Sequence, residues 1–290
     1  MGNNGLVDLH MHSTYSDGSC SPANLVKMAA KKGLCTIAIT DHDSVDGVDE
    51  AIAAGLIHGI EIIPAVELSV ELPGYHDVHL LGYFIDHHDP GFLDKLTLFQ
   101  TRRNDRIVAM VSRINSKLSR ERKKNVVQED VIALAGGAVG RPHIAMAMIA
   151  AGLVDTVQEA FDNYLTPCNV PKHYFAMSDA LAEIKRIQGV SVLAHPMTVT
   201  VNRTKMKGLI QMLACMGLNG IEIINNRCQE EEVSFLNGVA LANNLAITGG
   251  SDFHGLNEIS EMGAGRGSIA ATYAMVEELK IKKPKMTALR

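Results

Sequence analysis

Two short motifs near opposite ends of the chain carry side chains that commonly bind metal ions. They are Asp8-Leu9-His10-Met11-His12-Ser13 and Ser251-Asp252-Phe253-His254. Because alternate side chains of a β-strand point to the same face, His10 and His12 would converge on one point, and Asp252 and His254 would do the same. Imidazole is the commonest metal ligand in proteins. One such pair alone means little, but two pairs together indicate a metal centre.

Four further residues of metal-binding type lie between these motifs, in segments that we expect to end short apolar runs. They are His42 in Thr40-Asp41-His42-Asp43, Glu67 in Pro64-Ala65-Val66-Glu67, His79 in Val78-His79-Leu80 and His195 in Leu193-Ala194-His195-Pro196. The apolar runs at 36–39, 61–65, 78–81, 190–194 and 245–248 are typical of buried strands. If each polar group ends a parallel strand, the carboxyl-terminal rim of a barrel gathers them all. The sequence therefore predicts an α/β barrel with a metal site on that rim.

Helical segments alternate with the predicted strands. Ser21 and Pro22 form a typical helix start, a cap followed by proline in the first turn, and Gly33 marks the end of that helix. Further helices are expected at 46–58, 179–188, 205–216 and 229–243, each leading into an apolar strand. This alternation is typical of an α/β fold.

The middle of the chain interrupts the alternation. From 92 to 174 the segments are helical, because apolar residues recur at helical spacing, as they do between 107 and 118. We therefore expect residues 1–91 and 175–290 to form the barrel. Residues 92–174 would form an inserted helical subdomain that caps the substrate.

One segment of this insertion has a pattern suited to anion binding. A glycine-rich turn at 136–140 leads into Arg141-Pro142-His143 and an apolar helix. The N-terminus of a helix offers unpaired N–H groups and a positive dipole to an anion, and Arg141 would add a bidentate phosphate donor. Taken alone, the pattern fits equally well a helix–helix turn in which Arg141 forms a surface ion pair.

The composition of the 290 residues limits the expected partners and location. The net charge is −5 and no basic stripe is rich in aromatic residues, so we expect no binding of long nucleic-acid duplexes. Residues 1–5 lack the features of a secretion signal, and the apolar run at 144–154 is too short to span a bilayer core of about 30 Å. We expect no membrane segment. Five widely spaced cysteines, with no Cys-x-x-Cys pair, predict free thiols and a cytoplasmic location.

In their order along the chain, these motifs resemble those of the PHP (polymerase and histidinol phosphatase) family of phosphoesterases. The resemblance extends from the Asp8 to Ser13 motif to the Ser251 to His254 motif. It implies a distorted (β/α)7 TIM-like barrel with two or three divalent ions, and His with carboxylate ligands suits Mn, Fe and Zn alike. The Gly140-Arg141-Pro142-His143 segment resembles the branch that acts on nucleotides and related small phosphate esters.

The resemblance also implies a role for each polar residue of the motifs. The first ion would be held by His10, His12, Glu67 and Asp252, the second by Glu67, His79 and His195, and the third by Asp17, His42 and His254. Asp17 stands where many relatives carry His. Asp8, Asp41 and Asp43 lie beside these ligands in the sequence and would either orient imidazoles or serve as caps and turn residues.

Paired divalent ions of this kind activate water for attack on phosphorus. They lower the pKa of a bridging water toward about 7 and stabilise both the attacking and the departing oxygen of an in-line displacement. We expect Asp252 and Arg141 to act in catalysis, Arg141 by neutralising a phosphate oxygen in the transition state. The expected substrate contacts are Arg141, His143, Lys172 and Arg227. Arg227 follows Asn225-Asn226, near where relatives commonly carry His, and a second phosphate anchor there would favour a substrate with two phosphates.

Three functions compete on this sequence. The expected one is metal-dependent hydrolysis of a phosphate ester of a small phosphorylated metabolite, a nucleoside mono- or 3',5'-bisphosphate, by a metal-bridging hydroxide. The alternative is a phosphodiesterase or exonuclease that acts on cyclic phosphates or short oligonucleotides with the same ions. A non-catalytic metal-binding module would have lost one or more ligands, and none of the motif ligands is missing here.

Overall fold

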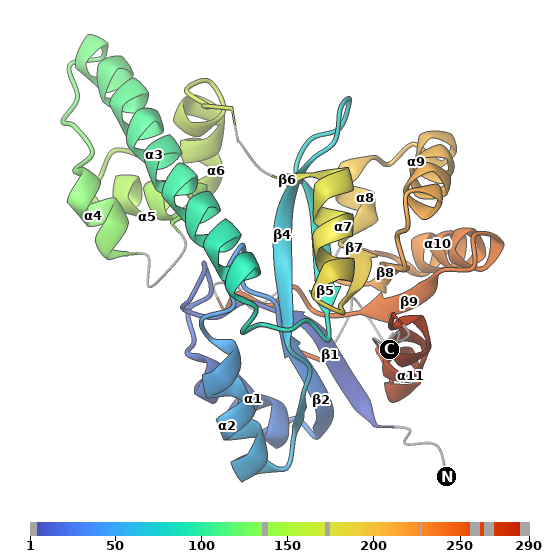
Figure 1. The fold of residues 1–290 in the computed structure, drawn as a ribbon. Coiled ribbons are helices and arrows are strands. Elements are labelled where there is room, and N and C mark those ends of the chain that lie inside the picture. The colour runs from blue at the N-terminus through green and yellow to red at the C-terminus, as the bar shows by residue number, and fades with distance from the viewer. Residues whose placement is uncertain are drawn as a thin grey trace.

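The strands of the protein fall into two sheets in a computed structural model that describes residues 5–134, 139–171, 175–226, 228–255, 262–263 and 270–284 (Figure 1). One sheet has the order β1 (Leu6–Met11), β2 (Leu34–Ile39), β3 (Glu61–Ile62). The other has the order β6 (Phe175–Ala176), β4 (Ala65–Glu71), β5 (Val78–Tyr83), β7 (Val190–Leu193), β8 (Gly220–Ile224), β9 (Ala246–Gly249).

Isolated parallel bridges join the two sheets at both ends. Met11 at the end of β1 pairs with Phe253 in the segment that follows β9, and His42 after β2 pairs with Glu67 of β4. Through these bridges, β1, β2, β4, β5, β7, β8 and β9 neighbour one another in a ring, with β3 as a short extension before β4. This arrangement agrees with the predicted distorted (β/α)7 barrel. It places the first strand, β1, beside the last strand, β9.

One strand of the ring runs against the others. β5 pairs antiparallel with both β4 and β7, whereas the remaining strand pairs are parallel. The prediction that every metal-binding residue follows the end of a parallel strand was therefore wrong for two of them. Glu67 lies inside β4, and His79 lies near the start of β5. A short connection between β4 and β5 permits a hairpin, and the reversal brings the start of β5 to the rim where its parallel neighbours end.

Helices connect or follow the strands of the ring along the chain and largely match the sequence predictions. They are α1 (Pro22–Lys31), α2 (Val48–His58), α7 (Met177–Arg186), the short α8 (Pro196–Val199), α9 (Arg203–Cys215), α10 (Glu230–Ala242) and α11 (Tyr273–Lys282). The predicted cap of the first helix is present, since the Ser21 hydroxyl accepts a hydrogen bond from the backbone N–H of Asn24. The sequence analysis did not predict α8 and α11.

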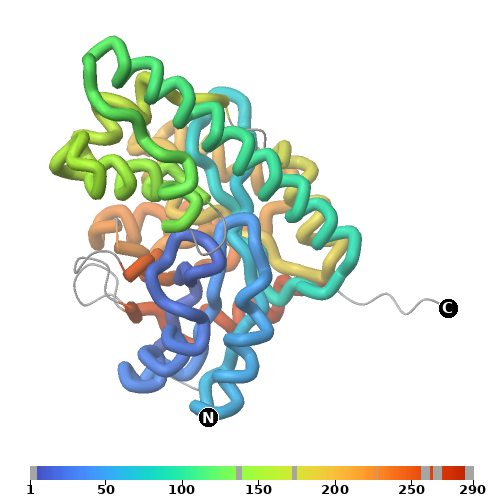
Figure 2. Tube along the Cα trace, turned by 90° about the vertical axis from the view of Figure 1, so that its left-hand side faces the viewer, coloured from blue at the N-terminus to red at the C-terminus, as the bar shows by residue number. Residues whose placement is uncertain are grey.

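The helices between β5 and β6 share a hydrophobic core of their own. They are α3 (Pro90–Arg120), α4 (Gln128–Ala133), α5 (Arg141–Ala150), α6 (Val157–Ala160) and the π-helix η1 (Phe161–Leu165). Ile107, Met110 and Ile114 of α3 pack there with Ile144 and Met148 of α5. Figures 1 and 2 both show this green to yellow-green block standing beyond one end of the barrel.

Two expectations about the chain as a whole can be compared with the described residues. All five cysteines are free thiols, as predicted. Within the described residues, we find no helix with the length and apolar character needed to span a membrane.

The contact between Gly250 and His10 tests how tightly the ring is packed. A Cβ added at Gly250 would lie 2.4 Å from both the backbone nitrogen and the Cβ of His10. We expect Gly250→Ala to lower the free energy of unfolding by about 1–3 kcal/mol, because the clash involves backbone. Gly208→Ala is the matched control. Gly208 lies in α9 with open space around it, so alanine there should raise the free energy of unfolding by about 0.5–1 kcal/mol. Urea unfolding measures both, and equal effects would contradict the proposed clash.

Candidate metal centre

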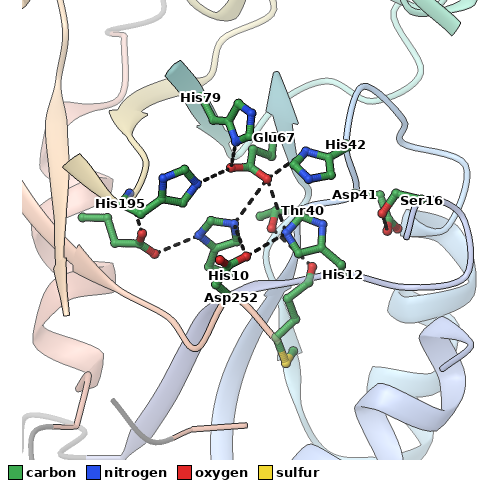
Figure 3. Close-up of polar contacts among 12 residues, drawn as sticks. His10, His12, Ser16, Thr40, Asp41, His42, Glu67, His79, His195 and Asp252 are labelled. Carbon is green, nitrogen blue, oxygen red and sulfur yellow. Dashed lines mark hydrogen bonds and ion pairs between the residues drawn. The ribbon is translucent and has the colours of Figure 1, made fainter. Parts of the chain in front are cut away.

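The carboxylate of Glu67 lies fully buried at the centre of five imidazoles (Figure 3). Its Oε1 lies 3.0 Å from His79 Nδ1 and 3.1 Å from His195 Nε2, and its Oε2 lies 3.0 Å from His42 Nδ1, 3.3 Å from His12 Nε2 and 3.4 Å from His10 Nε2. Each oxygen therefore faces a separate group of ring nitrogens. One carboxylate in this position can bridge two neighbouring ions.

Asp252 completes the group around Oε2 of Glu67. Its Oδ1 lies 3.3 Å from His12 Nε2 and 3.5 Å from His10 Nε2. The same two ring nitrogens thus face both Asp252 and Glu67, as predicted ligands of one ion should. Asp252 has a left-handed backbone conformation with φ 53°. This strained conformation lies in the segment that follows β9 (Ala246–Gly249) and is of the kind that clusters at functional sites.

Asp17 anchors a third group beside the first two. Its Oδ1 lies 3.2 Å from His254 Nε2, its Oδ2 lies 3.8 Å from His42 Nε2, and its Oδ1 lies 3.8 Å from His12 Nδ1. One ligand atom from each of these four residues lies within 4.8 Å of the others. The structure therefore brings all nine predicted metal ligands into one cluster. Their role as ligands stays a prediction.

The three carboxylates of the cluster favour the ionised form that metal ligands need. Burial raises the pKa of each, but the facing imidazoles outweigh burial and lower the pKa below its usual value. The largest opposing contribution to the pKa comes from His42 for Glu67 and Asp17, and from His10 for Asp252. Three negative charges are thus held together by the positive charge that surrounds them.

Two kinds of imidazole are distinguished among His10, His12 and His79. Burial lowers the pKa of His12 to about 3 and that of His79 to about 4, so both rings are neutral at pH 7 and ready to donate a lone pair. Burial also lowers the pKa of His10, but the carboxylates of Glu222 and Glu67 outweigh it and raise this pKa well above its usual value. An ion that binds an imidazole with a raised pKa, such as His10, would displace its proton.

Several buried ligand atoms of the cluster have no hydrogen-bond partner among the described residues. They are His10 Nε2, both ring nitrogens of His12, Asp17 Oδ1, His42 Nδ1 and Glu67 Oε2. An unsatisfied buried polar atom costs about 1–3 kcal/mol, and native proteins contain few of them. Divalent ions would satisfy this set at once, and imidazole and carboxylate are suitable donors for such ions. The residues present therefore fit the metals that the sequence predicts.

Glu222 is a residue of the centre that the sequence analysis did not identify. It is fully buried in β8, its Oε1 lies 2.9 Å from His10 Nδ1, and its Oε2 accepts a hydrogen bond of 2.8 Å from the backbone N–H of His195. Because one ring nitrogen of His10 is engaged by Glu222, the other is directed at Glu67 and Asp252. Carboxylates that orient ligand imidazoles in this way strengthen metal binding.

The aspartates beside the motif histidines have a different role. The carboxylate of Asp8 accepts hydrogen bonds from the backbone of Ser251 and Gly263, and that of Asp41 accepts them from Ser13 and Ser16. Asp43 accepts one from the backbone of Ser69 and pairs with Arg103. Of the two predicted roles, these contacts favour that of cap and turn residues.

A cleft of about 510 Å³ opens above the cluster. Predicted metal ligands form one side of it, and the insertion contributes Arg103 and Arg106 from α3, Arg141 from α5 and Phe161 from η1. Arg103 was not predicted. Its guanidinium pairs with Asp43, next to the predicted ligand His42, so a positive charge from the insertion lies beside the metal centre.

The predicted substrate contacts have different surroundings. Arg141 lines the cleft, its Nη2 lies 3.5 Å from a carboxylate oxygen of Asp77, and its guanidinium lies over the Phe161 ring. His143 is buried, and its Nδ1 accepts a hydrogen bond of 2.9 Å from the backbone N–H of Gly140. Its contact with substrate stays a prediction. Lys172, Arg227 and residues 136–138 of the glycine-rich turn lie outside the described residues.

A family model for the PHP domain matches residues 8–186 of the chain. The chain belongs to the PHP domain family. It is 29% identical to a 3',5'-nucleoside bisphosphate phosphatase from Chromobacterium violaceum, over 87% of this chain and 88% of the relative. It is 31% identical to a 5'-3' exoribonuclease from Haemophilus influenzae, over 85% of this chain and 89% of the relative.

A solved structure extends the likeness from sequence to fold. An amidohydrolase from Chromobacterium violaceum, with bound sulfate and no metal, has a TM-score of 0.81 and 26% identity to this chain. The match covers 95% of this chain and 96% of that structure. The predicted family and α/β fold are confirmed. The matched PHP domain range ends before His195, Asp252 and His254, which the fold brings back to the same cluster.

Substitution of Glu222 tests whether its carboxylate orients His10 for metal binding in the candidate centre. Glu222→Gln keeps the shape of the side chain but removes the charge that orients His10, so metal affinity or activity should fall about 10- to 100-fold. Titration of the chelator-treated protein with Mn²⁺ measures the affinity. Glu231→Gln is the control, because this glutamate side chain is 90% exposed. Equal affinities for the two variants would show that Glu222 does not support the centre.

Proposed function

We propose that the protein is a metal-dependent phosphoesterase that hydrolyses a phosphate ester of a nucleotide, a nucleoside 3',5'-bisphosphate or monophosphate. One observation carries this proposal. A buried cluster of imidazoles and carboxylates forms one side of a cleft, and arginines from the insertion form another. The names of the bisphosphate phosphatase and exoribonuclease relatives support the same class of reaction.

The charges of the two sides suit a phosphate ester. Two or three ions of Mn, Fe or Zn would supply hydroxide at neutral pH and offset the charge of the phosphate. Glu67 would bridge two ion sites. Asp252 would hold the first of these ions together with His10 and His12. Such ions would also separate the phosphate from the carboxylates of Asp17, Glu67 and Asp252, which all favour the ionised form.

The arginines would bind and orient the phosphate. A guanidinium donates two parallel hydrogen bonds to phosphate oxygens, and it stabilises the charge that these oxygens gain in the transition state. Arg103 pairs with Asp43, the residue after the predicted ligand His42, whereas Arg141 pairs with Asp77. Two cationic positions in one cleft suit a substrate that carries two phosphates. We assign residues 92–174 the role of a cap, because the arginines and Phe161 all come from this insertion.

A second function is supported by a separate observation. The chain shares 31% identity, over most of its length, with a protein named as a 5'-3' exoribonuclease. Hydrolysis of a cyclic phosphate or a short oligonucleotide would use the same ions and the same arginines. The two functions differ in the length of the substrate.

Turnover of a substrate panel distinguishes these functions. The panel contains nucleoside monophosphates, 3',5'-bisphosphates, cyclic phosphosugars and dinucleotides, with Mn²⁺ supplied after chelator treatment. We expect the highest kcat/KM for a 3',5'-bisphosphate and loss of activity when the metal is withheld. Faster hydrolysis of dinucleotides than of bisphosphates would favour the exonuclease instead. Failure on every substrate with Mn²⁺, Fe²⁺ and Zn²⁺ in turn would contradict both proposals.

Arg141 tests the phosphate-binding role of the insertion. Arg141→Ala should lower kcat/KM about 10- to 100-fold, because a hydrogen bond to a charged group contributes about 1.5–3 kcal/mol. Its ion pair with Asp77 is partly exposed, so the free energy of unfolding should change by less than about 1 kcal/mol. Arg113→Ala is the control, since Arg113 of α3 donates to the Asn169 carbonyl and is exposed. Unchanged kinetics for Arg141→Ala would rule out phosphate contact there.

A further inference from the structure

A second group of metal-binding side chains lies outside the metal centre. We call it the Asp49 cluster, and it consists of Asp49, His87 and His88. Asp49 belongs to the first turn of α2, and the two histidines lie in the connection between β5 and α3. His87 Nε2 lies 2.9 Å from Asp49 Oδ1, and His88 Nε2 lies 3.0 Å from Asp49 Oδ2. The sequence analysis did not single out any of the three residues.

We propose that the Asp49 cluster binds a divalent transition-metal ion, with Zn²⁺ as the best-suited ion. One ligand atom from each residue lies within 4.8 Å of the other two. Two imidazole nitrogens and one carboxylate oxygen form a donor set that zinc commonly accepts, and three protein ligands leave a coordination position for water. This site is separate from the metal centre and does not depend on the proposed phosphoesterase function.

The arrangement of the two imidazoles is the first argument for this proposal. Consecutive side chains of an extended segment point to opposite sides. His87 and His88 lie in a turn, which instead brings their ring centroids to 4.0 Å from each other and aims both Nε2 atoms at one carboxylate. Each ring faces a different oxygen of Asp49, so the three side chains already surround one point.

The backbone that carries the imidazoles is the second argument. The Asp86 N–H donates to the Ile187 carbonyl, and the Asp86 carboxylate accepts a hydrogen bond from the N–H of His88. Asp89 then caps α3 by accepting a hydrogen bond of 2.8 Å from the N–H of Phe92. Ligands held by such a network lose little conformational entropy when an ion binds.

The exposure of the cluster allows an ion to enter directly from solvent. The side chains of Asp49 and His88 are 69% and 66% exposed, whereas that of His87 is 12% exposed. An ion there would cross-link α2 of the barrel to the connection that leads into α3. Because α3 carries Arg103 and Arg106 to the cleft, the bound ion would fasten the insertion to the barrel at the start of its first helix.

Zinc titration of untagged protein tests the proposal. The protein is first saturated with Mn²⁺ at the metal centre, Zn²⁺ is added, and bound zinc is measured after removal of free ions. Asp49→Asn and His88→Gln should each bind about one Zn²⁺ less than the wild-type protein and lose most of the zinc-induced rise in Tm. His58→Gln is the matched control, because His58 is an exposed histidine at the other end of α2 and should bind as the wild type does.

Exchange of Mn²⁺ for Zn²⁺ at the metal centre affects all of these proteins alike, so the difference between variants reports on the Asp49 cluster. Both cluster variants replace exposed side chains, and circular dichroism checks that they fold. Equal zinc content and equal Tm shifts in Asp49→Asn, His88→Gln and the wild type would overturn the proposal. The result is independent of substrate turnover, and the proposed phosphoesterase function can fail or hold without changing it.

Discussion

The placement of three carboxylates side by side, Glu67 fully buried and Asp17 and Asp252 largely so, is the constraint on which the rest of this structure depends. An isolated carboxylate removed from water is very unfavourable, and it persists only when positive charge and hydrogen bonds surround it. Glu67, Asp17 and Asp252 meet that condition because imidazoles from both ends of the chain face them. The ring of strands, the strained backbone at Asp252 and the buried Glu222 all serve to bring those imidazoles into position.

The barrel and the insertion supply different parts of the cleft. The barrel supplies strand ends that hold charged groups at close distances from one another. The insertion supplies arginines and an aromatic ring from helices with their own hydrophobic core. If the insertion binds the substrate as proposed, changes in it would alter which phosphate ester is bound and leave the charges of the barrel in place.

The sequence predicted the residues whose signal is local and missed those whose role depends on distant partners. His10 and His12 could be recognised from their spacing within one strand. Glu222 could not, because it lies within an apolar strand and its partner His10 is 212 positions away. The reversal of β5 was also missed, since a short apolar run contains no information about strand direction. Arg103 is one of several arginines on a long amphipathic helix, and only the tertiary structure shows which of them reaches the cleft.

The reversed strand also explains why α3 runs some distance before it reaches the cleft. The end of β5 pairs with the start of β7, at Tyr83 and Val190, so the chain leaves the ring at the edge opposite His195. From Pro90, α3 must rise about 20 Å, at 1.5 Å per residue, before Arg103 arrives over the cleft. The helix acts as a fixed spacer. A single inserted residue would turn the guanidinium by about 100°, and a whole added turn would displace it by about 5.4 Å, so length variation among related proteins should be excluded from this stretch.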